Sequence, residues 1–331
     1  MTLTVGFVAN QLSIRGTETV LWAYAHYNET MLGNRSIILV KNRMDDVSEQ
    51  HYAVDVSADS TEWFASRFKE LHYCKEDSME DLMMQLGVDV CFIELAGVAS
   101  DWVPTRVPSV LHCVFQPLLK GTVSTGISQC VARGIIPVLP NIMPMHDTLD
   151  DMREELGIPK DAIVFGRYGG YGQFSIGFAR DAVRDVSSRN PNVYFLFMNT
   201  QQFMEPSRNV MFLTGTRDLC KKRKFINTCD AMLHAREDGE TFGAAIGEFA
   251  QCDKNIITCR YQLEPNEDEH IRILGDQCIT YENYDHLVHI LGNFHMYKKD
   301  MANNGYYRYL PEKVIPLFNM FINLATKNTA E

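Results

Sequence analysis

Short apolar runs alternate with longer amphipathic stretches along the whole chain, and this alternation constrains the fold more than any other feature. Runs of about four to eight apolar residues separated by helical spacing are typical of βαβ units, in which helices cover a parallel sheet. In the first half, strands are predicted at 4–9, 36–40, 88–93 and 109–114, and helices at 17–32 and 62–71.

The alternation restarts after a proline-rich segment in the middle of the chain. Pro137, Pro140 and Pro144 fall within eight residues and forbid a regular helix, so residues 136–146 are predicted to be a linker. The second series predicts strands at 162–166, 193–198, 209–213, 231–234 and 255–259, and helices at 150–156, 178–188, 242–252 and 313–324.

Two doubly wound α/β domains are the simplest architecture for this pattern. The length of 331 residues agrees with two domains at roughly 150 residues each. We place the domains at 1–142 and 143–331, with the final helix able to pack back on the first. A central restart predicts a cleft between the halves, with ligands outside the carboxyl ends of the strands.

Composition narrows the classes of partner. Lys and Arg number 31 against 42 Asp and Glu, and the net charge of −11 argues against a broad nucleic-acid surface. The nine scattered cysteines form no C-x-x-C, which favours a reducing compartment over a disulfide framework or a zinc knuckle. No signal peptide and no apolar run of about 20 residues is seen, so a cytoplasmic location without a membrane span is expected.

The most informative stretch is 230–250. An apolar strand ends at His234, a polar turn follows, and a small-residue helix is predicted to begin near residue 241, with Glu240 in the turn and Glu248 in the helix. Eight residues are about 2.2 helical turns, which would place the two carboxylates within about 80° of one face and roughly 12 Å apart. Both would then reach one extended ligand.

The start of this predicted helix suits an anionic or hydroxyl-bearing ligand. Backbone N–H groups of Thr241, Phe242 and Gly243 would be unpaired there and could bind a phosphate or a sugar hydroxyl. In the alternative interpretation, the acids of the turn only complement the helix dipole and the acid within the helix is solvated.

A second stretch, 163–174, is a strand that enters a glycine-rich turn. Its glycines match neither a dinucleotide fingerprint nor a P-loop. Arg167 lies at the carboxyl end of the strand and suits a bidentate contact to phosphate. The alternative is an arginine paired with a surface acid beside an ordinary turn.

Two features of the first half are candidates for the same site. Gly16-Thr17-Glu18 stands at a helix entrance, where an N-cap by Thr17 with Glu18 in the first turn would explain the same residues. His112 lies late in an apolar strand, where the chain is expected to open toward the cleft; the alternative is a core histidine with satisfied hydrogen bonds.

Two further motifs carry no predicted chemistry. His286, His289 and His295 lack a second ligand set with zinc-like spacing and are expected on the surface. The basic run 220–224 is expected to be a solvated helix start; a site for an anionic lipid or an acidic acceptor is the alternative.

Glu240-x7-Glu248, preceded by a strand and by Asp238-Gly239, resembles the E-x7-E signature of retaining GT-B glycosyltransferases, in particular glycosyltransferase family 4 and related group 1 transferases. The resemblance covers the C-terminal half specifically and the N-terminal half more loosely. It implies two Rossmann-like domains that face a central cleft, a nucleotide-sugar donor on the C-terminal domain, and no metal or other cofactor.

The resemblance also implies roles for the candidate residues. Glu240 would contact the donor sugar, Glu248 the ribose hydroxyls, and the N–H groups of 241–243 the sugar and diphosphate. Arg167 is similar to the family's Gly-Arg element and would clamp the diphosphate, but the Lys-Gly that usually follows is missing, so Arg167 works alone or another basic residue assists.

On the N-terminal side, Gly16-Thr17-Glu18 resembles the family's G-G-x-E loop with one of its two glycines, and would lie against donor and acceptor. His112 resembles the cleft histidine that contacts the donor sugar and helps the transition state, acting with Glu240 and Arg167 as the catalytic set.

The predicted activity is transfer of a sugar from a UDP- or GDP-sugar to an acceptor hydroxyl, with retention of anomeric configuration and without metal. A nucleotide-sugar epimerase on the same scaffold and a non-catalytic nucleotide-sugar-binding subunit are the alternatives. A phosphorylase would need a lysine-bound cofactor, for which the sequence shows no site.

Overall fold

The chain forms two compact units. The computed structural model describes residues 2–12, 16–41, 58–260 and 267–327. Unit 1 comprises residues 1–144 together with 308–331, and unit 2 comprises residues 145–307. The first break is two residues from the boundary that we placed after residue 142, and the residues that follow unit 2 return to unit 1.

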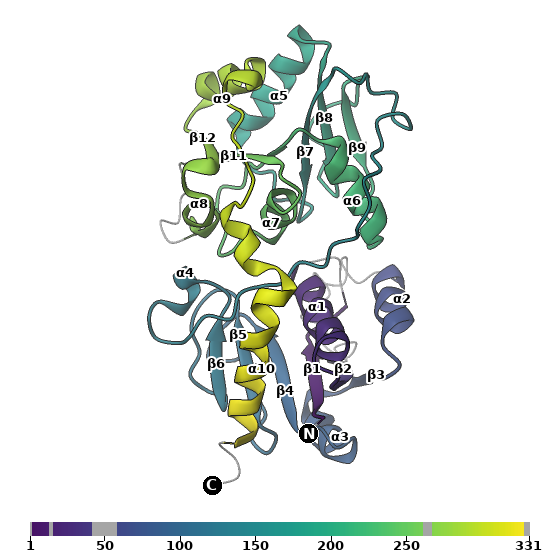
Figure 1. Cartoon of the computed structure of the whole chain (residues 1–331), viewed down its shortest axis with the longest axis vertical. Coiled ribbons are helices and arrows are strands. Elements are labelled where there is room, and N and C mark those ends of the chain that lie inside the picture. The colour runs from purple at the N-terminus through teal and green to yellow at the C-terminus, as the bar shows by residue number, and fades with distance from the viewer. Residues whose placement is uncertain (1, 13–15, 42–57, 261–266, 328–331) are drawn as a thin grey trace. The chain divides into compact units, whose positions relative to one another are not determined.

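Unit 1 is built on a six-stranded parallel sheet in the order β3-β2-β1-β4-β5-β6 (Figure 1). Its longer strands, of five to seven residues, are mostly apolar and buried, as expected where helices cover both faces of a parallel sheet. The strands are β1 (Thr4–Ala9), β2 (Arg35–Lys41), β3 (Leu71–Cys74), β4 (Val90–Leu95), β5 (Ser109–Cys113) and β6 (Val123–Gly126). The helices are α1 (Gly16–Thr30), α2 (Ala58–Arg67), α3 (Glu76–Gln85), α4 (Gln129–Ala132) and α10 (Pro311–Lys327).

The last helix, α10, completes the core of unit 1. It runs along β4, β5 and β6 and also contacts α1 (Figure 1, yellow). The ring of Phe318 lies 5.1 Å from that of Tyr24, 5.4 Å from that of Phe92 and 6.1 Å from that of Phe7, measured between centroids. These aromatic contacts join the last helix to the first strand and the first helix.

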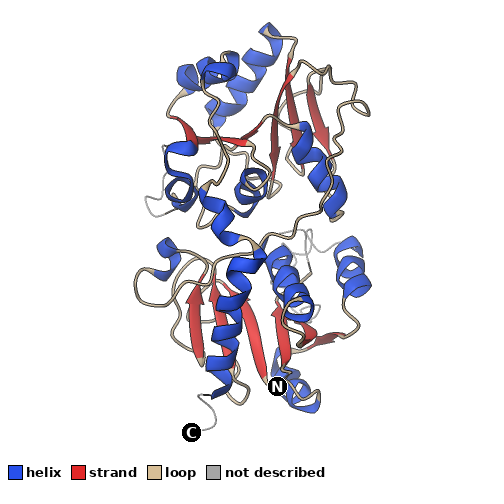
Figure 2. Cartoon of the chain, in the orientation of Figure 1, coloured by secondary structure: helices blue, strands red, loops and turns tan. Residues whose placement is uncertain are grey.

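Unit 2 repeats the same plan with a parallel sheet in the order β12-β11-β10-β7-β8-β9, flanked by helices (Figure 2). The strands are β7 (Ile163–Tyr168), β8 (Val193–Met198), β9 (Val210–Leu213), β10 (Ala231–Leu233), β11 (Asn255–Cys259) and β12 (Cys278–Tyr281). The helices are α5 (Gly177–Arg189), α6 (Leu219–Thr228), α7 (Ala244–Ala250), α8 (Glu269–Leu274) and α9 (Tyr284–Gly292).

Both sheets have the doubly wound 3-2-1-4-5-6 order when each unit's strands are numbered from its own first strand. The chain direction across the sheet reverses between β1 and β4 in unit 1, and between β7 and β10 in unit 2. In such sheets this switch point, at the carboxyl ends of the strands, is where ligands bind.

The predicted doubly wound fold is confirmed, and each of the nine predicted strands overlaps an observed strand. The predicted helix at 150–156 is wrong, because its polar side chains bond the local backbone instead. The carboxylate of Asp151 accepts from the N–H of Arg153 at 2.8 Å, and the segment forms a single turn.

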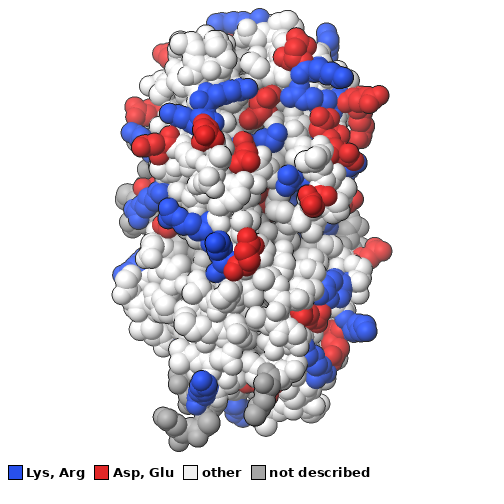
Figure 3. Space-filling view, viewed as in Figure 1, with Lys and Arg blue, Asp and Glu red and all other residues white. Residues whose placement is uncertain are grey.

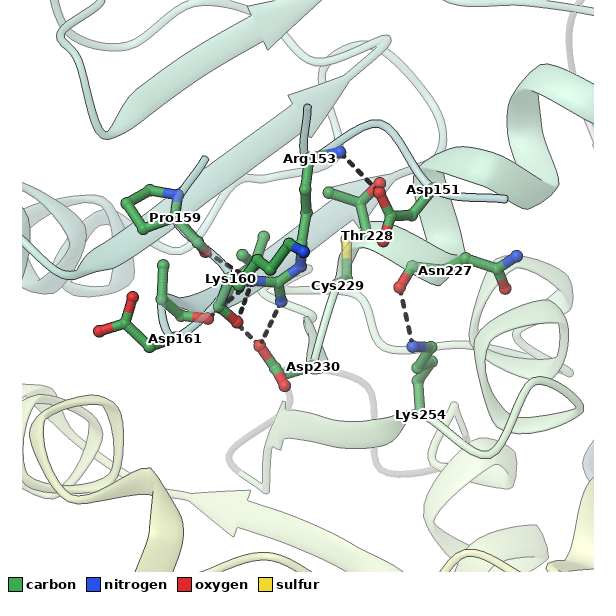
Figure 4. A network of polar contacts seen from close by, with 12 residues as sticks. Asp151, Arg153, Pro159, Lys160, Asp161, Asn227, Thr228, Cys229, Asp230 and Lys254 are labelled. Atoms are coloured by element: carbon green, nitrogen blue, oxygen red, sulfur yellow. Dashed lines mark hydrogen bonds and ion pairs between the residues drawn. The ribbon is translucent and has the colours of Figure 1, made fainter. Parts of the chain in front are cut away.

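Arg153 instead ties this turn to the amino ends of the unit 2 strands (Figure 4). Its guanidinium donates to the carbonyls of Pro159 and Ala162 at 3.1 and 3.0 Å and to the carboxylate of Asp230 at 3.1 Å. The same Asp230 oxygen accepts from the N–H of Val164 at 2.9 Å. This network holds the end of the sheet opposite the switch point.

The face in Figure 3 carries both signs of charge. Basic and acidic side chains lie among one another over its upper half, and much of its lower half carries neither. Within the part of the chain that the structure describes, no helix is long and apolar enough to cross a membrane.

Candidate functional site

The switch point of unit 2 brings together residues from two segments far apart in the sequence. Arg167 lies at the carboxyl end of β7, and His234 directly follows β10. The glycine-rich loop after β7 closes against the segment after β10, because the N–H groups of Ser175 and Ile176 both donate to the carbonyl of Ala235, at 2.8 and 3.2 Å.

Arg167 is 4% exposed and makes its contacts with neutral groups. Its guanidinium donates to the hydroxyl of Thr200 at 2.6 Å and to the carbonyls of Gly170 and Asn199 at 2.7 and 3.2 Å. Burial lowers the pKa of Arg167 to about 10, which still leaves it charged at neutral pH. Neutral acceptors fix the orientation of the side chain without cancelling its positive charge.

Glu240 is held in the turn that precedes α7. Its N–H donates to the carbonyl of Glu267 at 2.6 Å, and its side chain is 21% exposed. One carboxylate oxygen lies 3.3 Å from Nε2 of His234, and the other accepts from Arg236 at 3.1 Å. Burial by itself would raise the pKa of Glu240, but the hydrogen bond with His234 and the charge of Arg236 lower it to about 2. A partly exposed carboxylate is therefore ionised at neutral pH.

A buried series of polar contacts fixes the orientation of the His234 ring. Since the carboxylate of Glu240 only accepts, Nε2 of His234 donates to it, and Nδ1 of His234 lies 2.7 Å from the hydroxyl of Thr258. That hydroxyl also lies 3.0 Å from Nε2 of His270. Burial lowers the pKa of His270 to about 3, so its ring is neutral and can hold this arrangement.

Glu248 lies in the interior, 1% exposed. Its Oε1 accepts from Nζ of Lys222 at 2.6 Å, and its Oε2 accepts from the hydroxyl of Tyr168. Burial raises the pKa of Glu248 and lowers that of Lys222 to about 7. The structure thus gives Glu240 and Glu248 different partners, and it corrects the interpretation of 220–224, because Lys222 is buried.

The turn from Glu240 to α7 is tightly packed. Gly243 has φ of +78°, and a Cβ there would lie 3.0 Å from the hydroxyl of Tyr306 and 3.2 Å from Cβ of His270. Phe242 is buried, and its carbonyl accepts from that same hydroxyl at 2.6 Å. Because α7 begins at Ala244, Glu240 lies outside the helix, and the angle expected from helical geometry does not apply.

In unit 1, Gly16, Thr17 and Glu18 lie in the first turn of α1, so Thr17 is not an N-cap. The hydroxyl of Thr17 donates to the carboxylate of Glu18 at 2.9 Å, and Glu18 is buried. Thr17 and Glu18 line a cavity of about 160 Å³ at the carboxyl ends of β1 and β4.

His112 is fully buried and does not line this cavity. Its Nε2 lies 2.8 Å from the carbonyl of Leu139, and its Nδ1 lies 3.3 Å from Oε1 of Glu94. Burial lowers the pKa of His112 to about 4. The expected opening of the chain toward a ligand at His112 is not observed within unit 1.

Sequence reasoning missed several residues of these two centres, namely Tyr168, Lys222, Arg236, Thr258, His270 and Glu94. Glu94 directly follows a predicted strand, so its position at a strand end was a usable signal. Lys222 lies three residues before buried Phe225, and this helical spacing places it on the inner face of α6. Within the described ranges, no group of three or more His, Cys, Asp or Glu side chains is placed to hold a metal ion.

Among known proteins, this chain is similar to solved structures in its fold but matches none in its sequence. No family model matches the chain, and no curated protein matches it. Anabaena HepE, solved with UDP and glucose, is similar with a TM-score of 0.67 at 12% identity, over 97% of this chain and 99% of that one. WaaG, a glycosyltransferase of lipopolysaccharide biosynthesis, is similar with a TM-score of 0.62 at 11% identity, over 95% and 99%.

A third similar structure is that of the putative UDP-N-acetylglucosamine 2-epimerase from Listeria monocytogenes. Its TM-score is 0.62 at 9% identity, over 97% of this chain and 96% of that one. The two doubly wound sheets and these similarities define a two-domain α/β protein of the Rossmann-like class. Its particular fold is GT-B, the fold of the similar glycosyltransferases.

Proposed function

We propose that this protein transfers a sugar from a nucleotide-diphosphate sugar to an acceptor hydroxyl. One observation carries the proposal: the unit 2 switch point presents an arginine whose charge is not cancelled by its contacts, together with the ionised, partly exposed carboxylate of Glu240. Similar folds support it, since HepE was solved with UDP and with UDP-glucose.

Arg167 would hold the diphosphate, whose negative charge grows as the sugar departs. Fixed donors of this kind stabilise developing charge without reorganising, and one donor can lower a barrier by about 3–4 kcal/mol. Glu240 would accept hydrogen bonds from the donor sugar hydroxyls, and the backbone of 241–243 would border the same ligand. A UDP- or GDP-sugar donor, retention of configuration and independence of metal belong to this proposal through the E-x7-E resemblance.

Glu248 has a different part in the proposal from the ribose contact that the resemblance implies. Ribose hydroxyls would have to displace Lys222 or Tyr168 from its carboxylate. We therefore infer that Glu248 is a positioning residue. It anchors Tyr168 and, through the adjacent backbone, the end of β7 that carries Arg167.

On unit 1, Gly16, Thr17 and Glu18 are proposed to serve the acceptor side. They border the cavity at the switch point of that unit, or lie next to it in α1. His112 is proposed to act indirectly, since its ring contacts Glu94 and the carbonyl of Leu139 from within the core.

The test uses Glu240→Gln, which keeps the shape of the side chain, and Glu237→Gln as the matched control on an exposed acid three residues away. A thermal-shift panel of UDP- and GDP-sugars identifies the donor, because a ligand at 100 times its Kd stabilises by about 2.7 kcal/mol. We expect Glu240→Gln to lose sugar transfer at least a hundredfold while it stays folded, and Glu237→Gln to match the wild type. Equal transfer rates for both variants would contradict the site.

The similar Listeria structure makes epimerisation the second candidate. Incubation of the identified donor without acceptor separates the two activities, because an epimerase changes the sugar configuration while a transferase needs an acceptor. Donor binding without turnover across a broad acceptor panel would instead indicate a binding subunit.

A further inference from the structure

A buried carboxyl group without a hydrogen-bond partner lies at the unit 1 switch point. Glu94, in β4, has a side chain that is 5% exposed and lines the cavity of about 160 Å³. Within the described part of the chain, neither of its carboxyl oxygens has a hydrogen-bond partner. His112 approaches Oε1 to 3.3 Å, but without the geometry of a hydrogen bond.

The cavity walls combine acids with apolar groups. Glu18 is the second acid, while Val8, Leu21 and Phe115 supply apolar surface. None of the described residues that line the cavity is basic. Burial, together with the charge of Glu18, raises the pKa of Glu94 well above its usual range.

An unpaired buried carboxyl group costs free energy of folding, and a hydrophobic residue of similar size would avoid that cost. Glu94 holds no other described element in place through a hydrogen bond. Groups that cost stability and satisfy no internal partner are concentrated at functional sites. The position at the carboxyl ends of β1 and β4 agrees, because ligands of doubly wound sheets bind there.

We propose that Glu94 accepts a hydrogen bond from a hydroxyl of the acceptor sugar ring, and that this cavity selects uncharged rings over rings that carry a carboxylate or phosphate. The inference rests on the proposed transferase function and adds the acceptor class to it. A sugar ring offers hydroxyl donors for Glu94 and a C–H face for Leu21 and Phe115. An anionic substituent would meet the negative charge of Glu18 and no cation among the described residues that line the cavity.

The experiment measures binding of neutral methyl hexosides and of the matching uronic acids by ligand-observed NMR. Wild-type protein is compared with Glu94→Leu, with the isosteric Glu94→Gln, and with Glu62→Gln as a control on an exposed acid of unit 1. We expect wild type to bind at least one neutral hexoside, and its uronic acid at least tenfold more weakly. Glu94→Leu should lose neutral binding at least tenfold. Glu94→Gln, which keeps a hydrogen-bond acceptor, should retain both neutral binding and the preference over uronic acids, and Glu62→Gln should change neither.

Melting temperature provides an independent readout. Removal of an unpaired buried carboxyl group should raise the melting temperature in Glu94→Leu, whereas removal of a structural group would lower it. The proposal is overturned if no neutral hexoside binds wild type, if uronic acids bind equally well, or if Glu94→Leu melts lower and binds normally. Failure of the proposed function is distinct, because it would be seen as absent donor binding or turnover at unit 2.

Discussion

The buried pair of Glu248 and Lys222 yields the sharpest test of how unit 2 is assembled. Glu248→Leu would leave the buried amine of Lys222 and the half-buried hydroxyl of Tyr168 without their shared acceptor. Loss of one partner of a buried ion pair costs about 3–5 kcal/mol, because the remaining group either stays charged without a partner or has to give up its proton. We expect the free energy of unfolding of unit 2 to fall by that amount.

The second perturbation removes both charges. Glu248→Leu combined with Lys222→Met replaces the pair with apolar groups of similar volume, which is often neutral or stabilising. The half-buried hydroxyl of Tyr168 has then lost its acceptor, at a cost of about 1 kcal/mol, and Tyr168→Phe removes that cost too. Stability should therefore recover in two steps, although the number of substitutions increases.

Urea denaturation followed by circular dichroism, with calorimetry to separate the transitions of the two units, measures this series. Glu282→Leu, at an exposed acid of unit 2, is the control and should change stability by no more than about 0.5 kcal/mol. The reasoning is refuted if Glu248→Leu costs less than about 1 kcal/mol, a loss too small for a broken buried pair. If Glu248→Gln instead lost donor affinity without a change in stability, the result would support the ribose contact that the resemblance implies for Glu248.

Three other predictions follow from single side chains. The stability of unit 1 should fall as pH drops from 6.5 toward 4, because burial lowers the His112 pKa to about 4 and the unfolded chain therefore binds the proton first. Over this pH range the loss amounts to about 3 kcal/mol of unfolding free energy. Urea titrations of His112→Asn should not show this loss. Gly166→Ala should lower the free energy of unfolding by about 1–3 kcal/mol, and with it the melting temperature, because the new Cβ would lie 2.2 Å from Sγ of Cys229. Gly172→Ala, where a Cβ would meet no atom within 4 Å, should melt like wild type. Arg167→Lys keeps the charge but loses the fork geometry, so calorimetric titration should show donor affinity at least tenfold weaker, about 1.4 kcal/mol; unchanged affinity would exclude a bidentate clamp.

Much of the fold could be predicted from sequence because strands of a parallel sheet that are buried on both faces read as apolar runs. Strands 4–9 and 193–198 agree with the structure residue for residue. By contrast, β3 has only four residues, with an intermediate or exposed environment for each, and so gives no such run. The turn at 150–156 depends on acceptors from residues 159, 162 and 230, which no local pattern contains.

The candidate site also combines residues that local sequence patterns predict with contacts that they do not. Arg167 and Glu240 could be found from a local signal, because each stands next to a glycine, Arg167 near the end of a strand and Glu240 in the turn that follows one. The pairing of Glu248 with Lys222 could not, since the two residues come from different helices and meet only after the sheet has formed. Position along the chain therefore indicated which residues meet at the switch point of unit 2, but not which of the acids are already paired in the interior.

The placement of α10 has a consequence for the order in which the protein is made. A ribosome adds all of residues 145–307 before it adds Phe318, so the whole of unit 2 is synthesised before the core of unit 1 can be completed. During that interval Tyr24, Phe92 and Phe7 of unit 1 lack the helix that covers them. Domains usually mature from the N-terminus during synthesis. Here the first unit to emerge is the last whose core can be completed, because the helix that covers these three rings is synthesised last.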